Sequence, residues 1–258
     1  MSKTLLMIHG VGCGGDVWDR MIPFFEADGW TCEAPTLFPG RRVKSNPPQS
    51  LSELGIDDYI SAMSAKAKEI EKATGEKPAV IGHSMGGLIA QVLAERGDVS
   101  QAVFLTPAQP KGCAVIGPSV AITFLNILIQ QNRKKSYKVW RTGFDFGVTN
   151  CVPKRLREDI YAEALYDSGK VYGDLTDGVE VDESKVKIPT LTIAAGKDRA
   201  TLASAVRKVA EKYSRAPVAG DFLEYPKNGH WIVDEPGTDQ VAADIASWLE
   251  RTRAKETA

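Results

Sequence analysis

The sequence lacks an excess of either charge. Its 32 Lys and Arg residues nearly cancel its 33 Asp and Glu residues, which leaves a net charge of −1 over 258 residues. Such a chain has no global field to attract nucleic acid or an anionic membrane. No basic cluster is interleaved with aromatic residues either. We therefore expect no nucleic-acid partner.

Long hydrophobic runs and paired cysteines are also missing. The apolar run 119–129 is far shorter than the roughly 20 residues that a membrane-spanning helix needs. The apolar start of the chain is too brief for a signal peptide and is typical of a strand. Four scattered cysteines, without a CxxC pair or a histidine at metal-ligand spacing, predict reduced thiols and no metal site. We expect a cytoplasmic protein without stable membrane insertion.

What the sequence does contain is a regular alternation of two patterns. Short apolar, β-rich runs alternate with helical patterns, and the runs are nearly continuous in hydrophobicity, as in strands covered on both faces. This alternation predicts an α/β fold with a mostly parallel, twisted sheet of about six strands flanked by helices, in a single domain over residues 1–258. The predicted strands are 4–9, 31–37, 78–83, 102–108, 189–196 and 222–226.

One interval interrupts the alternation. Residues 109–187 contain apolar, basic, aromatic and helical stretches but no clear strand of the sheet. A structureless loop of that length is improbable in a compact domain. We therefore predict an inserted helical cap over 109–187 that lies over one end of the sheet.

A serine stands between two glycines where the third predicted strand meets a helix. Gly82-His83-Ser84-Met85-Gly86 matches G-x-S-x-G, and the strand and the helix supply the context that this motif requires. The glycines remove side chains that would clash at so tight a turn, and the serine hydroxyl is pushed clear of the sheet. This pattern predicts Ser84 as a nucleophile.

A serine nucleophile needs a base, and the chain has only three histidines. His83 is adjacent to the serine, so on a sharp turn its ring should point away from the hydroxyl. His9 belongs to the end of the first strand. His230, which follows the last predicted strand, remains as the base.

The base must be held by a buried carboxylate between Ser84 and His230 in the chain. Asp198 follows the fifth predicted strand, at the edge of the sheet where loops from several strands converge. It is the predicted acid. The alternatives are cap residues that would have to reach inward and two weaker candidates near the last strand: Asp145, Asp167, Asp174 and Asp177, then Asp221 and Glu224.

The glycine-rich segment after the first strand supplies backbone amides beside the serine if the two strands are neighbours. The amides of Val11 and Met85 are the predicted oxyanion-hole donors, although the glycines could also form a tight turn only. Cys13 lies near this loop and is expected to line the pocket. It has no second base of its own, so we do not predict a catalytic thiol.

These motifs together resemble the α/β-hydrolase superfamily over nearly the whole chain. The resemblance rests on His9-Gly10, the Ser84 motif, Gly196-Lys197-Asp198 and Gly229-His230. It begins directly at the strand before the oxyanion loop, without the antiparallel hairpin common in the superfamily. This compact form is similar to plant methyl esterases, hydroxynitrile lyases and small bacterial esterases. The chain departs from the family where a proline often follows the acid, at the expected pocket wall near Leu202.

The resemblance implies a serine hydrolase that cleaves a small, mainly apolar carboxylic ester through an acyl-enzyme, with a lactone or thioester as variants and with no metal or organic cofactor. A hydroxynitrile lyase would need a lysine beside the base. Here Trp231 follows His230, and Lys227 is three residues earlier. Perhydrolase or acyltransferase chemistry at the same residues, and a ligand receptor without turnover, remain alternatives.

Substrate evidence is thinner. Aromatic residues of the cap and the residue after the base are predicted to line the pocket, although the run 119–129 could instead pack onto the sheet. The basic run 132–138 is typical of a solvated face, with recognition of an acidic substrate as the alternative. We expect a small-molecule ester as partner, and a homodimer stays open. The predicted substrate-binding residues are Cys13, Phe124, Trp140, Phe144, Leu202 and Trp231.

Overall fold

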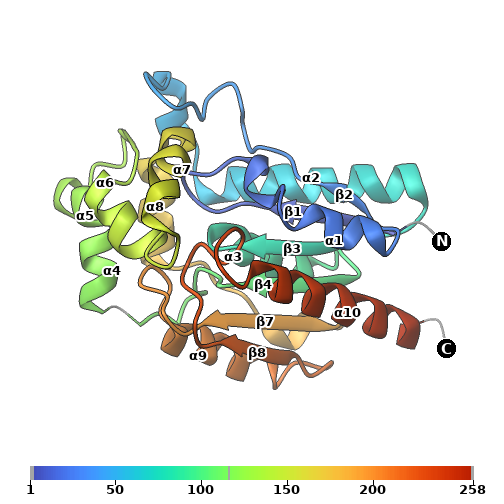
Figure 1. The fold of residues 1–258 in the computed structure, drawn as a ribbon. Helices are drawn as coiled ribbons and strands as arrows, with labels where there is room; N and C mark the ends of the chain where they lie inside the picture. The colour runs from blue at the N-terminus through green and yellow to red at the C-terminus, as the bar shows by residue number, and fades with distance from the viewer. Residues whose placement is uncertain (1–2, 116, 257–258) are drawn as a thin grey trace.

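The computed structural model describes residues 3–115 and 117–256, and its core is one six-stranded sheet (Figure 1). All neighbouring strands pair in parallel, in the order β2-β1-β3-β4-β7-β8. The prediction of an α/β fold with about six mostly parallel strands is therefore confirmed. The strands are β1 (Thr4–Ile8), β2 (Thr31–Glu33), β3 (Ala79–His83), β4 (Gln101–Leu105), β7 (Thr190–Ala195) and β8 (Asp221–Tyr225).

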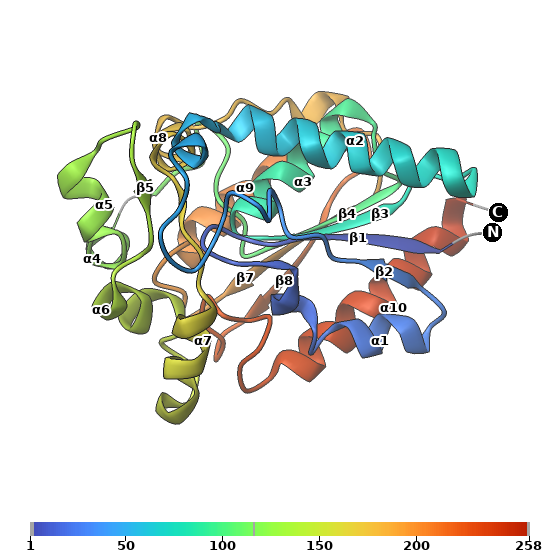
Figure 2. The ribbon, with the colours of Figure 1, turned by 90° about the horizontal axis from the view of Figure 1, so that it is seen from above.

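Helices cover both faces of the sheet (Figure 2). Because successive strand residues point to opposite faces, Leu6 and Ile8 pack in the core under one helical layer and Leu5 and Met7 in the core under the other. One layer consists of α2 (Ile56–Thr74), α3 (Met85–Arg96) and α9 (Ala203–Tyr213); the other consists of α1 (Ile22–Ala27) and α10 (Thr238–Glu256). In the part of the chain that is described, no helix is both long and apolar enough to cross a membrane.

Local signals in the sequence explain where α1 and α2 begin and end. After β1 the chain forms a 3₁₀-helix η1 (Gly15–Trp18) and then α1, with Pro23 in the first turn of α1, where a missing N–H costs nothing. Helix α2 begins after Gly55, whose amide donates to the Asp58 carboxylate (2.7 Å). It ends at Gly75, whose φ of 79° suits glycine.

The interval 109–187 contributes no strand to the six-stranded sheet among its described residues. Its helices up to Asp177 lie beyond the carboxyl ends of the strands (Figure 1), whereas the last one directly precedes β7 and pairs through Lys185 with Glu95 at the end of α3. A two-stranded antiparallel sheet, β5 (Ser136–Tyr137) with β6 (Asp167–Ser168), was not predicted, because two-residue strands carry no readable periodicity. The helices are α4 (Pro118–Thr123), α5 (Leu125–Gln130), α6 (Arg141–Gly143), a π-helical turn η3 (Phe144–Val148), η4 (Lys154–Leu156), α7 (Arg157–Glu163), α8 (Gly169–Asp177) and η5 (Glu183–Lys185). We call residues 109–187 the cap.

Candidate active site

Ser84 occupies the sharp turn between β3 and α3, with φ 55° and ψ −119°. A positive φ is uncommon for a residue with a side chain, and strain of this kind is concentrated at functional sites. The flanking glycines are required by packing. A Cβ on Gly82 would lie 2.0 Å from the Gly86 carbonyl oxygen, and a Cβ on Gly86 would lie 2.0 Å from that of Ile8. The G-x-S-x-G spacing therefore lets strand and helix approach closely enough to form this turn.

Ser84, His230 and Asp198 form a continuous chain of hydrogen bonds. The Ser84 Oγ lies 3.1 Å from Nε2 of His230, and Nδ1 of His230 lies 2.8 Å from Oδ2 of Asp198. The three residues are at most 7% exposed. A carboxylate only accepts, so it fixes the proton on Nδ1 and leaves Nε2 free to accept the serine proton. The fold brings Ser84 to two side chains that lie more than a hundred residues further along the chain.

The Asp198 carboxylate is held by its own loop. The amides of Ala200 and Thr201 both donate to Oδ1 at 2.8 Å. Charge-assisted bonds to backbone N–H groups stabilise an ionised carboxylate and fix its direction. The competing cap and strand carboxylates are engaged elsewhere: for example, Glu224 pairs with Arg207 and Asp167 with Arg42.

Two buried side chains around His230 were not predicted as part of the site. His83 donates from Nε2 to the main-chain carbonyl of His230 (2.8 Å), and burial lowers the pKa of His83 to about 3, so its ring is neutral. Glu235 accepts from the Gly229 amide (2.6 Å), and burial raises the pKa of its carboxyl. Both act on the backbone around His230. Their only sequence signal is closeness in the chain to Ser84 and His230.

The glycine loop after β1 lies against Ser84 because β1 and β3 are neighbours, with Ile8 paired to Gly82. A Cβ on Gly10 would lie 2.9 Å from the Cβ of Ser84, so only glycine fits there. Val11 follows and lines the cavity that contains Ser84. Met85 is the first residue of α3, where an amide has no acceptor within the helix.

A narrow cavity of about 20 Å³ opens at Ser84 and His230. Of the predicted substrate-binding residues, Cys13, Phe124, Phe144 and Trp231 line it. Lys138, the last residue of the basic run 132–138, lines it too, whereas Arg133 from the same run pairs with Asp174 and Asp177.

The structure places two of the predicted substrate-binding residues, Trp140 and Leu202, away from this cavity. The indole of Trp140 donates to the Ile122 carbonyl within the cap (3.2 Å). Leu202 precedes α9 and lies against Gly117. Neither lines the cavity beside Ser84 in the described structure. Both positions depend on how the cap chain folds back on itself, which no local pattern shows.

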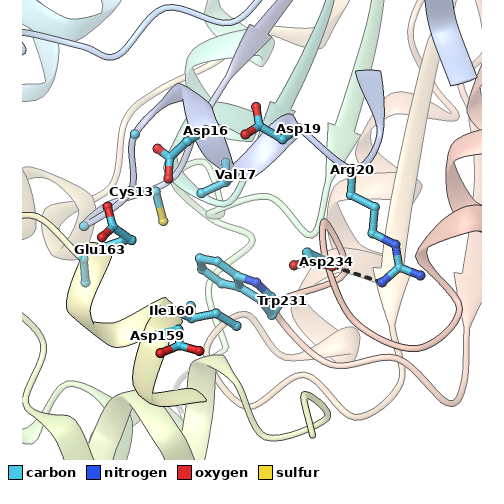
Figure 3. Close-up of a pocket in the computed structure, with 13 residues that line it drawn as sticks. Cys13, Asp16, Val17, Asp19, Arg20, Asp159, Ile160, Glu163, Trp231 and Asp234 are labelled. Atoms are coloured by element: carbon cyan, nitrogen blue, oxygen red, sulfur yellow. Dashed lines mark hydrogen bonds and ion pairs between the residues drawn. The ribbon is translucent and has the colours of Figure 1, made fainter. Parts of the chain in front are cut away.

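A larger cavity of about 300 Å³ adjoins the narrow one, since Gly12, Cys13, Ala164 and Trp231 line both. Figure 3 shows Trp231 between Val17 on one side and Ile160 of α7 on the other. Arg20, at its rim, is paired with Asp234 (3.0 Å) and Asp239 (2.9 Å). The surroundings are therefore acidic. The carboxylates that line this cavity are Asp16, Asp19, Asp159, Glu163 and Asp234.

Neither a catalytic thiol nor a metal site is favoured by the residues near Ser84. Burial raises the pKa of the Cys13 thiol to about 12, so it is protonated and a poor nucleophile. Within residues 3–115 and 117–256, no three His, Cys, Asp or Glu side chains are grouped so that they could hold a metal ion.

A parallel sheet with a sharp serine turn after β3 and helices beyond its carboxyl edge defines a class, and sequence comparison agrees. The model of the Alpha/beta hydrolase family matches residues 5–244, so the chain belongs to this family. Norfluorocurarine synthase 1 from Strychnos sp. is 25% identical over 244 residues, which cover 92% of this chain and 84% of the relative.

Solved structures with this fold cover nearly the whole chain. Tomato methylketone synthase I, in complex with 2-tridecanone, is similar with a TM-score of 0.72 and 17% identity, over 98% of this chain and 99% of that one. The methylesterase protein MES16 from Arabidopsis is similar with a TM-score of 0.69 and 15% identity, over the same shares.

Proposed function

We propose that the protein is a serine hydrolase that cleaves a small, mainly apolar carboxylic ester through an acyl-enzyme. The observation that carries this proposal is the buried chain from Asp198 through His230 to Ser84 at a strained turn. Membership of the alpha/beta hydrolase family and the likeness to a methylesterase support the same reaction class.

In this mechanism the Ser84 Oγ attacks the ester carbonyl while Nε2 of His230 takes its proton. Asp198 stabilises the imidazolium that forms. The amides of Val11 and Met85 donate to the oxyanion of the tetrahedral intermediate. When that intermediate collapses, the C–O bond breaks and His230 gives its proton to the leaving alcohol. A water molecule, activated by the same histidine, then hydrolyses the acyl-enzyme and releases the acid.

The two cavities support a short acyl group. The narrow cavity at Ser84 has room for a group of only a few atoms, and its walls are mainly apolar: Phe124, Val139, Phe144, Val148, Ala164, Leu165 and Trp231. The larger adjoining cavity would receive the alcohol portion. We therefore expect p-nitrophenyl acetate to be a better substrate than the butyrate, and the octanoate to be the poorest.

Pre-steady-state release of p-nitrophenol from these esters tests the proposal. The parent protein should give a burst near one equivalent followed by turnover, and Ser84→Ala should give neither. Equal slow release from both proteins would contradict ester hydrolysis at this site, and attention would then turn to ligand binding without chemistry.

Cyanohydrin cleavage is a second candidate, because Lys138 is among the residues that line the narrow cavity. Its Nζ lies 4.7 Å from the centre of the Tyr161 ring, and burial lowers the pKa of Lys138. A lysine near the base is what the lyase alternative requires. Release of cyanide from mandelonitrile that depends on both Ser84 and Lys138 would favour this candidate over ester hydrolysis.

A further inference from the structure

Asp167, which the cap contributes through β6, lies in the most completely buried ion pair of the described residues. Its side chain and that of Arg42 have no exposed surface. Arg42 donates from Nε to Oδ1 (2.8 Å) and from Nη2 to Oδ2 (2.7 Å), and the Tyr59 hydroxyl donates to Oδ1 (2.7 Å). A buried pair of this kind is costly to desolvate and contributes little net stability, so a gain in stability does not explain why it is present.

The same aspartate reaches the glycine loop beside Ser84. The Gly12 amide donates to Oδ2 of Asp167 (2.5 Å), and the amide of Leu165, two residues earlier in the cap, donates to the Gly12 carbonyl (2.8 Å). The cap thus holds Gly12 by both its N–H and its C=O. Gly12 directly follows Val11, the proposed oxyanion donor.

A second branch reaches the other side of Val11 through Arg42. Arg42 Nη1 and the Leu37 amide both donate to Nε2 of His9, at 3.2 and 3.0 Å. Since Nε2 accepts, the ring proton is on Nδ1, which donates to the Gly10 carbonyl (2.9 Å). Burial and the Arg42 charge lower the pKa of His9 to about 3, so this neutral tautomer persists at working pH.

The Gly10 carbonyl and the Val11 N–H belong to one trans peptide, in which the two groups point in opposite directions. Fixing the carbonyl on His9 therefore aims the Val11 N–H away from His9. The loop residue Gly10 itself lies against Ser84. Hydrogen bonds thus lead from Asp167 through Arg42 and His9 to Gly10 on one side of Val11, and from Gly12 back to Asp167 on the other. The backbone from Gly10 to Gly12 closes this circuit around Val11.

We propose that Asp167 is a positioning residue by which the cap orients the oxyanion-binding amide of Val11. The proposal rests on the proposed function, because it deepens the account of that same site. A donor aimed at the oxyanion acts on the transition state and hardly on the bound ester. Loosening the circuit should therefore lower kcat and leave KM nearly unchanged.

The test compares Asp167→Asn with the parent enzyme. Oδ1 of Asp167 accepts from Arg42 and Tyr59, and Oδ2 accepts from Arg42 and Gly12. The asparagine NH₂ cannot accept, so two of these bonds are lost at nearly constant volume. Loss of one oxyanion donor typically costs about 10²–10³ in kcat, and a misaligned one should cost about 10–100-fold. We expect that loss with KM within about twofold. The Ki of a trifluoromethyl ketone, which forms a tetrahedral oxyanion on Ser84, should rise in parallel with the loss in kcat/KM.

A matched control separates positioning from general damage to the cap. Asp174 is also a cap aspartate, accepting from the Ile56 amide (3.0 Å) and pairing with Arg133, but it belongs to neither branch of the circuit. Asp174→Asn should keep the parent kcat and Ki. If Asp167→Asn does not fold, Arg42→Lys provides the test, since it keeps the charge but cannot bridge Asp167 and His9 together.

Three results would overturn the inference. These are a parent-like kcat in Asp167→Asn or Arg42→Lys, a rise in KM without a loss in kcat, or an equal loss in Asp174→Asn. A parent protein without a Ser84-dependent burst would instead contradict the proposed function, and the positioning role would fail with it. The burst therefore distinguishes the two failures.

Discussion

Two buried aspartates at opposite sides of Ser84 receive similar numbers of hydrogen bonds but differ in their partners. Asp198, after β7, faces a histidine and two loop amides. Asp167, in the cap, faces the guanidinium of Arg42 together with Tyr59 and Gly12. The partner of Asp198 gains a positive charge only when His230 takes a proton, whereas that of Asp167 is charged at all times.

This difference separates a carboxylate suited to a transient charge from one suited to a fixed scaffold. An ion pair that is already complete cannot respond to charge that develops during a reaction. A carboxylate beside a neutral imidazole can, because it stabilises the imidazolium as it forms. We call Asp198 with His230 and its two loop amides the Asp198 region, and Asp167 with Arg42, Tyr59 and Gly12 the Asp167 region. The first is suited to the proposed chemistry and the second to holding the glycine loop in place. The predictions that follow test this contrast, beginning with the largest effect.

Asp198→Asn should reduce kcat by about 10⁴ with little change in folding. An asparagine that donates to Nδ1 holds His230 in the wrong tautomer, with its proton directed at Ser84, as in serine proteases with the equivalent change. The measurement is kcat for p-nitrophenyl acetate together with the urea midpoint of unfolding. A loss below about tenfold would mean that Asp198 is not the acid, and Glu235→Gln would then be the next variant to assay.

In the Asp167 region, Arg42→Met should reduce the free energy of unfolding by about 3–5 kcal/mol, because it leaves Asp167 buried, charged and without its ion-pair partner. The double variant Arg42→Met/Asp167→Leu should recover much of that loss. In the other region, His230→Gln removes a neutral partner, and it should cost only about 1–2 kcal/mol. Urea unfolding of the four proteins checks this. Equal costs for Arg42→Met and His230→Gln would remove the distinction between the regions.

The sequence predicted the Asp198 region far better than the Asp167 region, and the reason is locality. Ser84, Asp198 and His230 each follow a strand, and parallel strands bring their carboxyl ends to one edge whatever the intervening chain does. The Gly82 and Gly86 spacing is likewise a local steric requirement. The strand positions and these three side chains could therefore be predicted from short patterns.

The Asp167 region depends on contacts that no short pattern encodes. Arg42 and Asp167 are 125 residues apart, and their meeting depends on the path of the whole cap. The sequence left Asp167 as an alternative acid that would have to reach inward, and it gave His9 only a place at the end of a strand. Trp140 and Leu202 were predicted to line the pocket, and the sequence could not place them because short patterns carry no information on long-range contacts. Burial of an ion pair is a tertiary property that composition does not reveal.

Beside each aspartate lies a buried histidine that is not part of the proposed triad, His9 near Asp167 and His83 near His230, which allows a comparison by pH. The pKa values of His9 and His83 are both lowered to about 3. Below pH 6.5 the unfolded chain binds a proton on each that the folded protein does not bind until about pH 3. As the pH is lowered through this window, the free energy of unfolding should therefore decrease by about 1.4 kcal/mol per pH unit for each histidine. Above pH 6.5 the two histidines should have no effect on it.

His9→Asn and His83→Asn should each remove about half of this slope, and the double variant should remove nearly all of it. Urea unfolding at several pH values between 7 and 5 measures the slope while most carboxylates remain ionised. A slope that persists in the double variant would show that other groups take up the protons. A larger change for one histidine alone would show that the two regions bury their histidines unequally.

The smallest effect is expected from carboxylates that are neither buried nor paired. Asp19 and Asp159 are exposed at the larger cavity, so solvent and salt screen them, unlike Asp167 and Asp198. Their charge should still disfavour an anionic ester, by roughly 2–3-fold in kcat/KM. Asp19→Asn/Asp159→Asn should raise kcat/KM for monomethyl succinate by that factor and leave methyl butyrate unchanged, while Glu211→Gln on α9 should change neither. The gain should shrink in 1 M salt, where the Debye length is about 3 Å. A gain that is equal for both esters, or insensitive to salt, would show that these carboxylates act through shape and not through charge.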